Sequence, residues 1–322
     1  MDKNKTVIFA LTSSVDLAKE ICKHIGTELG KSEVKHFADG EILVELNESV
    51  RGKNVYIVQS TCNPVSHTVM ELLIAIDACK RASAHTINII MPYYGYARQD
   101  RKARPRQPIT SKLMADLYTA AGASRVVTCE LHATQIQGFF DIPADDLSAI
   151  SIIARYFRDK KFNSEEIVVV SPDHGGTVRA RKLAELLHAP IAIIDKRRPR
   201  ANDAEAMNLI GDVNGKRAIV IDDMVDTAGT LMTGINMLYD KGATEVYTAC
   251  VHGVLSGPAI ERIKNSKIVE FICTNTIDQS AKQPLLDKMT VLSVAELFAS
   301  AIKSIEDAAP LSDVVKRFNS GF

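Results

Sequence analysis

Two adjacent carboxylates, Asp222 and Asp223, follow the apolar run 218–221 and precede a turn of small residues, 226–230. The apolar run predicts a buried strand of a parallel sheet, and residues 231–239 predict a helix. A strand, a tight loop and a helix N-terminus form an anion cradle, because backbone N–H groups converge there and the helix dipole favours phosphate. The two acids would repel phosphate, but they can accept hydrogen bonds from sugar hydroxyls. We therefore expect a phosphorylated sugar here, in preference to a solvated acidic turn.

A second candidate site is the cationic segment 98–106, which contains five arginine or lysine side chains in nine residues. So many cations cannot be packed together without partners. The segment is therefore a solvated loop, a patch for RNA, or a lid that closes on a polyanion such as a nucleoside triphosphate. Tyr93, Tyr94 and Tyr96 beside it could stack a base or pack at the edge of the core.

Three further polar segments follow predicted strands. Segment 171–177 has two adjacent glycines, which allow close backbone approach to phosphate, and Asp173, which can hold a divalent cation. Segment 195–198 places cations at the carboxyl end of a strand, where α/β sheets bind ligands, although it could also be a turn into the next loop. His132 follows the strand 125–129, and a single histidine in such a place is more often structural than a ligand.

The composition is that of a globular protein. Lys+Arg and Asp+Glu both number 39 in 322 residues, so the overall charge favours neither nucleic acid nor a membrane surface as partner. The apolar run 7–11 is too short for a signal peptide, and no run approaches the length of a membrane span. Six scattered cysteines without CxxC spacing predict reduced thiols, so we expect a cytoplasmic protein.

Alternating apolar patterns must position these segments. Strands are predicted at residues 6–11, 42–46, 55–59, 86–91, 125–129, 167–170, 191–194, 217–221, 245–251 and 268–273, and helices at 15–26, 66–81, 109–121, 150–157, 178–187 and 231–239. This βα alternation predicts mostly parallel sheets with helices on both faces.

The pattern restarts after about residue 148, which predicts two domains, 1–148 and 149–322, with the place of the tail after about residue 305 left open. The halves look like a degenerate duplication, because residues 55–81 repeat the strand, loop and helix of 218–239. Gln59 and Ser60 stand in the first half where the second has the acid pair. Only the second half is therefore expected to bind the sugar phosphate.

Together these segments resemble ribose-phosphate pyrophosphokinases of the ATP-using class I type. The resemblance covers about residues 9–298 and is carried by segments 37–41, 93–102, 131–141, 171–176 and 221–230. It implies an α/β fold of two tandem phosphoribosyltransferase-like domains. It also implies transfer of the β,γ-diphosphoryl group of Mg-ATP to the anomeric hydroxyl of ribose 5-phosphate, giving phosphoribosyl pyrophosphate and AMP for nucleotide biosynthesis.

The resemblance implies roles for matching residues. Asp222 and Asp223 would hold ribose hydroxyls, and Asp226, Thr227, Ala228, Gly229 and Thr230 the 5-phosphate; Lys196 and Arg198 would stabilise the migrating group; His132 and Asp173 would bind Mg²⁺; Phe37, Asp39, Glu41, Arg98, Gln99, Asp100, Arg101 and Lys102 would bind ATP. The first three ATP residues would reach the nucleotide across a subunit interface. The resemblance therefore implies a homo-oligomer of dimers, usually assembled into a hexamer.

Two segments depart from the family pattern, residues 104–108 and the tail after residue 298. Ser49 and Arg51 resemble part of the family's regulatory phosphate site, to which the tail also contributes, so the resemblance leaves regulation open. Three other interpretations remain: a non-catalytic relative that binds active synthase subunits, a phosphoribosyltransferase, and an RNA-binding regulator. The intact cationic segments disfavour the non-catalytic relative. The duplicated architecture disfavours a phosphoribosyltransferase, and the neutral overall charge disfavours an RNA-binding regulator.

Overall fold

The computed structural model describes residues 5–197 and 206–320, and the chain forms two compact units. The first unit comprises residues 1–148, 276–278 and 293–316, and the second comprises 149–275, 279–292 and 317–322. We had placed residues 293–305 in the second domain and left the tail after about residue 305 open, but residues 293–316 group with the first unit. The physical reason is α8 (Ala295–Glu306), whose Glu306 carboxylate accepts hydrogen bonds from Tyr56 (2.8 Å) and Asn54 (3.2 Å) of the first sheet.

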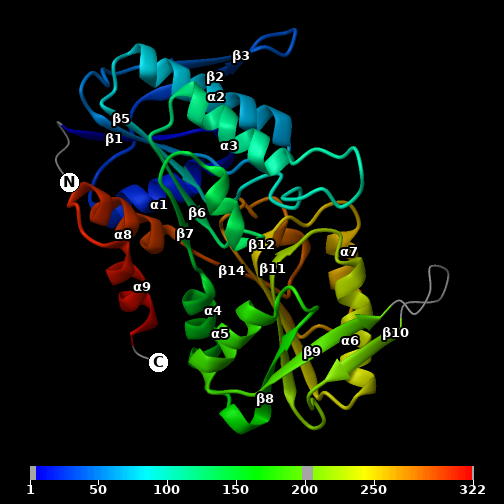
Figure 1. Ribbon diagram of the computed structural model, residues 1–322. Helices are drawn as coiled ribbons and strands as arrows, with labels where there is room; N and C mark the ends of the chain where they lie inside the picture. Colours follow the sequence, from blue (N-terminus) through cyan, green and yellow to red (C-terminus); the bar gives the residue numbers. More distant parts are fainter. Residues whose placement is uncertain (1–4, 198–205, 321–322) are drawn as a thin grey trace. The chain divides into compact units, whose positions relative to one another are not determined.

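The first unit contains a five-stranded parallel sheet in the order β1-β4-β5-β6-β7 (Figure 1). Its strands are β1 (Thr6–Ala10), β4 (Asn54–Val58), β5 (Thr86–Met91), β6 (Arg125–Cys129) and β7 (Ala144–Leu147). Helices α2 (Val65–Arg81) and α3 (Thr110–Ala121) cover one face, and α1 (Val15–Ile25) and α8 cover the other. Successive side chains of β4 point to opposite faces of the sheet and contact different helices. Ile57 packs in the same core cluster as Leu72 of α2, whereas the Tyr56 hydroxyl contacts α8.

A separate antiparallel hairpin of the first unit, β2 (Ser32–His36) and β3 (Ile42–Leu46), packs against α2. Strand β2 was not among the predicted strands. Most side chains of this strand are exposed and charged or polar, so it lacks the apolar alternation by which a strand is recognised.

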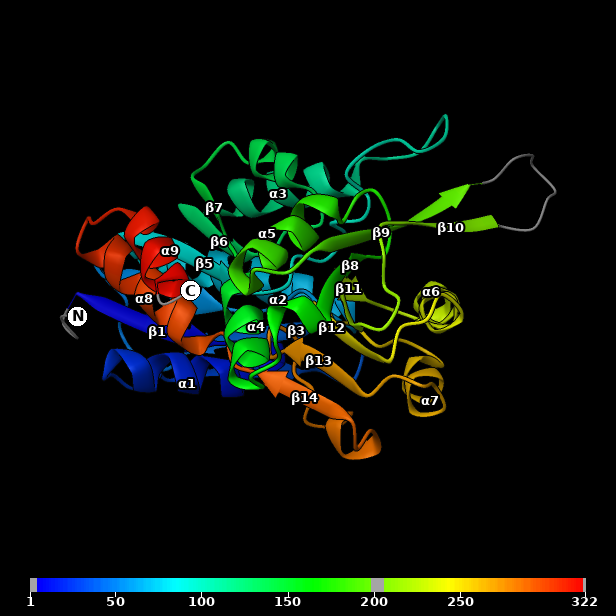
Figure 2. The same ribbon diagram turned by 90° about the horizontal axis from the view of Figure 1, so that it is seen from below.

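The second unit contains a seven-stranded sheet in the order β10-β9-β8-β11-β12-β13-β14, parallel except for β10 against β9. Its strands are β8 (Ile167–Ser171), β9 (Ile191–Arg197), β10 (Ala206–Ile210), β11 (Arg217–Val225), β12 (Glu245–Gly253), β13 (Glu270–Thr274) and β14 (Met289–Leu292). Figure 2 shows α6 (Gly229–Asp240) and α7 (Ala259–Lys264) on one face and α4 (Ile150–Asp159) and α5 (Thr177–Leu187) on the other. Val220 of β11 packs in one cluster with Ile235 of α6. The α/β fold with mostly parallel, two-faced sheets is confirmed.

The remaining predicted strands and helices lie within a few residues of their expected bounds. Unpredicted elements are β2, β7, β10, β14, α7, α8 and α9 (Leu311–Asn319). All six cysteines are buried free thiols, as the absence of CxxC spacing predicted. Among the residues that the structure describes, no helix is both long enough and apolar enough to cross a membrane.

Candidate active site

The acid pair lies inside β11 rather than after it, which corrects our prediction of a strand end at Ile221. Pairing of β11 with β12 continues to Val225, whereas pairing with β8 covers only residues 217–220. The nine-residue neighbour β12 therefore keeps the chain extended through two acids that disfavour strands. At the carboxyl edge of the sheet, Asp222 and Asp223 occupy the part of β11 beyond its pairing with β8.

Arg179 of α5 supplies a positive charge beside the acid pair. Its Nη1 lies 3.5 Å from Oδ1 of Asp222 and 3.5 Å from Oδ1 of Asp223, and its side chain is only 11% exposed. The Asp223 N–H also donates to Asp222 Oδ1 at 2.9 Å. Burial raises the pKa of Asp222 well above its ordinary value, the neighbouring Asp223 charge adds to the rise, and Arg179 opposes it. Among the residues that the structure describes, the guanidinium of Arg179 therefore offsets part of the negative charge of the two acids.

The small-residue turn after β11 is shorter than predicted, because α6 begins at Gly229. Gly229 and Thr230 are thus helical, and the loop proper is Asp226, Thr227 and Ala228. Ala228 has a left-handed conformation (φ 59°), which ends the extended chain and begins the helix. The first N–H groups of α6 have no acceptor within the helix, so they can bind an anion.

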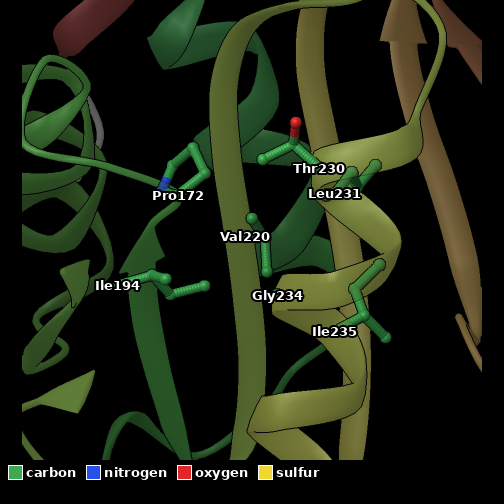
Figure 3. Close-up of a pocket in the computed structure, with 7 residues that line it drawn as sticks. All are labelled: Pro172, Ile194, Val220, Thr230, Leu231, Gly234 and Ile235. Carbon is green, nitrogen blue, oxygen red and sulfur yellow. The ribbon is translucent and has the colours of Figure 1, made fainter. Parts of the chain in front are cut away.

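A small pocket lies between this helix and the strands (Figure 3). Its lining is apolar except for Thr230 and includes Pro172, Ile194, Val220 and Ile235. A Cβ on Gly234 would lie 2.9 Å from Ile194 Cδ1, so the glycine permits α6 to approach β9. The cavity volume of about 10 Å³ is barely enough to hold one water molecule, and the lining offers almost no polar partners. It is a packing gap and not the sugar site.

The diglycine loop after β8 is tied to β9. Ser171 Oγ donates to the Asp173 carbonyl at 2.6 Å, and the Gly176 N–H donates to Asp173 Oδ1 at 2.9 Å. His174 Nε2 lies 2.8 Å from Oδ1 of the buried Asp195, which precedes Lys196 in β9. Since β8 lies between β9 and β11, the carboxyl ends of three adjacent strands carry the predicted sugar and diphosphate segments. Lys196 belongs to β9, and Arg198 lies outside the described residues.

In the first unit, hydrogen bonds hold the side chains of two residues near the start of the cationic segment. Gln99 Oε1 accepts from Thr110 Oγ1 at 2.6 Å, and Asp100 Oδ2 accepts from Gln135 Nε2 at 3.1 Å. Arg98 and the cations from Arg101 to Arg106 are exposed. Tyr93 and Tyr94 are core residues, because both are buried and the Tyr94 hydroxyl donates to the Ser111 carbonyl. His132 is exposed in the loop after β6.

The remaining predicted residues also lie in the first unit. Phe37, Asp39 and Glu41 form the exposed turn of the β2–β3 hairpin, where Phe37 is 50% exposed and Asp39 Oδ1 accepts from the Glu41 N–H. Ser49 Oγ accepts from the Arg51 N–H at 3.4 Å, and Arg51 Nη1 donates to Ser83 Oγ at 3.2 Å. An exposed aromatic ring beside two carboxylates is free to meet a second molecule.

Comparison with known proteins shows the family of the chain. Residues 6–122 match the N-terminal domain of ribose phosphate pyrophosphokinase, and residues 198–316 match the phosphoribosyl synthetase-associated domain. Ribose-phosphate pyrophosphokinases of Bacillus caldolyticus and Halalkalibacterium halodurans are 59% and 57% identical to the chain over 305 residues, with 95% of this chain and 96% of each relative covered. The chain belongs to the ribose-phosphate pyrophosphokinase family.

A solved structure supports the membership of this pyrophosphokinase family. Phosphoribosylpyrophosphate synthetase from Mycobacterium smegmatis matches the fold with a TM-score of 0.89 at 40% identity, covering 95% of this chain and 100% of that one. The resemblance predicted from the motifs is therefore confirmed.

Two positively charged residues beside the acid pair and its loop, Arg179 and Arg262, were missed by the sequence analysis. Arg179 lies three residues after the diglycine loop, in the first turn of α5. This position was the only feature of the sequence that could have indicated a role for Arg179. Arg262 belongs to α7, a short helix that was not predicted. Its Nη1 donates to the Thr227 carbonyl at 2.8 Å.

Proposed function

We propose that the chain transfers the β,γ-diphosphoryl group of ATP to the anomeric hydroxyl of ribose 5-phosphate, forming phosphoribosyl pyrophosphate and AMP for nucleotide biosynthesis. One observation carries the proposal: an acid pair, a small-residue loop at a helix N-terminus and a diglycine loop share one sheet edge. This combination recognises both hydroxyls and phosphates of one ligand. The family membership of the whole chain points to the same reaction.

The second unit would bind the sugar and the migrating group. Asp222 and Asp223 accept hydrogen bonds from ribose hydroxyls, while residues 226–230 hold the 5-phosphate. The anomeric oxygen attacks the β-phosphorus of ATP, the bond from that phosphorus to the α,β-bridging oxygen breaks, and AMP leaves. Lys196 and Arg198 neutralise charge on the migrating group. Positioning and charge compensation are the main requirements of phosphoryl transfer.

We propose Asp173 of the second unit and His132 of the first unit as residues that would each bind a magnesium ion. Asp173 offers an exposed carboxylate, and exposed His132 would add a nitrogen ligand. Within the part of the chain that the structure describes, no three potential ligands gather into a closed metal site. Mg²⁺ usually keeps several waters and binds through one or two carboxylates plus substrate phosphates. When bound, the ion would neutralise phosphate charge.

The first unit would supply the nucleotide site and the contacts between subunits. Arg98, Gln99, Asp100, Arg101 and Lys102 would bind ATP phosphates and close over them. The turn with Phe37, Asp39 and Glu41 would reach the nucleotide of a neighbouring copy, so we propose homodimers assembled into a hexamer in the cytoplasm. Ser49 and Arg51 would bind a regulatory phosphate.

Nucleotide separation after mixing the protein with Mg²⁺, ATP and ribose 5-phosphate tests the proposal. We expect AMP to appear only when the phosphorylated sugar is present, with ribose as the matched control. ADP as the product would mean transfer of the γ-phosphoryl group and would contradict the proposal. Binding of both substrates without any turnover would favour the non-catalytic relative.

A further inference from the structure

A segment that the proposed reaction does not use lies against the loop after β11. Three consecutive carbonyl groups, the last of β11 and the first two of the loop, accept hydrogen bonds from it. The Leu255 N–H donates to Val225 O at 3.0 Å, the Ser256 N–H donates to Asp226 O at 3.0 Å, and Arg262 Nη1 donates to Thr227 O at 2.8 Å. We call these three donors the carbonyl clamp.

The clamp orients the N–H groups that follow each carbonyl. In a planar trans peptide the C=O and the next N–H point in opposite directions. Since the three carbonyls are directed towards the clamp, the N–H groups of Asp226, Thr227 and Ala228 are directed away from it. These groups lead into the first turn of α6, and successive N–H groups of this kind form an anion-binding concavity. The clamp therefore turns the negative ends of three peptide dipoles away from the phosphate side.

Arg262 is the member of the clamp that acts through a side chain. Its Nη1 would lie 3.1 Å from a Cβ added to Gly229, so the guanidinium lies directly against the first residue of α6. A fixed positive charge at this distance from the loop attracts a bound phosphate as well as holding the carbonyl. A lysine can keep the charge but cannot reproduce the planar fork of the guanidinium.

We propose that Arg262 is a positioning residue for the sugar-phosphate loop, which it holds through the Thr227 carbonyl in the conformation that presents N–H groups to the 5-phosphate. This inference rests on the proposed function only in assigning that loop to the 5-phosphate. The charge of Arg262 adds to the affinity for the phosphorylated sugar, whereas the nucleotide site does not depend on it.

The test compares Arg262→Met with Arg262→Lys in the full-length protein, and Lys264→Met serves as the matched loss of charge on the same helix. Calorimetry without ATP measures the Kd for ribose 5-phosphate, and kinetics give the KM values for both substrates and kcat. We expect Arg262→Met to raise the Kd and KM for ribose 5-phosphate about tenfold, the usual effect of losing a charged hydrogen bond. The KM for ATP should stay within about twofold, Arg262→Lys should recover part of the loss, and Lys264→Met should behave as wild type.

Unchanged affinity of Arg262→Met for ribose 5-phosphate would overturn the inference. Equal losses for both substrates together with a lower melting temperature would also overturn it, because they indicate a general structural role. The proposed function fails separately. If wild type binds ribose 5-phosphate but forms no AMP, the reaction is wrong, while the Kd comparison still decides the role of Arg262.

Discussion

The two units place similar strand–loop–helix elements in their sheets but fill the end of the strand differently. In the first unit, β4 is followed by Gln59, Ser60 and Thr61, which are neutral and fully buried. In the second, β11 carries Asp222 and Asp223 beside a loop at a helix N-terminus. The first arrangement is a closed polar core, whereas the second carries two charged side chains, of which Asp223 is buried and Asp222 is partly exposed.

Hydrogen bonds within the first unit show how that core is closed. Gln59 Nε2 donates to Glu71 Oε2 at 2.9 Å, and Gln59 Oε1 accepts from Ser13 Oγ at 2.8 Å. Ser60 Oγ donates to the Thr276 carbonyl. Each of these buried groups has a partner inside the unit, which makes the network stabilising. The difference teaches that one supersecondary element can hold either a neutral network or a pair of charges at its strand end, and we propose that only the charged one binds a ligand.

The largest expected effect is on catalysis at the edge of the second sheet. Lys196→Ala should lower kcat about 100- to 1000-fold, because a charge that stabilises the transition state is lost. Circular dichroism should remain that of wild type. The exposed Lys241→Ala is the matched control. Turnover within a few-fold of wild type would remove the charge-stabilising role of Lys196.

Charge at the corresponding position of the first unit should be harmful to stability. Gln59→Glu would place a second carboxylate against buried Glu71, so we expect the free energy of unfolding to fall by about 3 kcal/mol. Chemical denaturation measures it, with Gln283→Glu at an exposed site as control. If Gln59→Glu were as stable as wild type, the strand end of the first unit would tolerate a charge, which would contradict the difference that we describe between the two units.

Removing charge from the second unit should weaken sugar binding instead. Asp223→Asn should raise the KM for ribose 5-phosphate about tenfold, since a neutral amide is a weaker acceptor of hydroxyl hydrogen bonds. Steady-state kinetics test this, with exposed Asp240→Asn as control. An unchanged KM would contradict the assignment of Asp223 to the ribose hydroxyls.

The smallest expected effect is a pH-dependent gain in stability. The raised pKa of Asp222 means that the folded state binds its proton more tightly than the unfolded chain, so stability falls as pH rises from about 4 through the raised value. In Asp222→Asn this loss of stability does not occur, because asparagine does not titrate. Its melting temperature relative to wild type should therefore increase with pH, reaching about 2 °C above wild type at pH 8. A difference that does not change with pH would mean that the titration of Asp222 is not linked to folding.

Local patterns in the sequence were sufficient for much of the fold. The βα alternation predicted two-faced parallel sheets, and the apolar periods predicted β5 and β6 with the bounds that the structure has. They were insufficient where long-range pairing overrides local preference. Strand β11 continues through two acids because β12 supports it, and polar β2 forms because β3 pairs with it.

The order of residues by itself determined the acid pair, the small-residue loop and the diglycine loop, because each is a contiguous segment with its own chemistry. Only the tertiary structure decided which residues surround them. Arg179 precedes Asp222 by 43 positions, and Arg262 follows Thr227 by 35. Likewise, the bonds of Glu306 to β4 placed α8 in the first unit. Such distances depend on sheet pairing and helix packing, which no local period of apolar residues specifies.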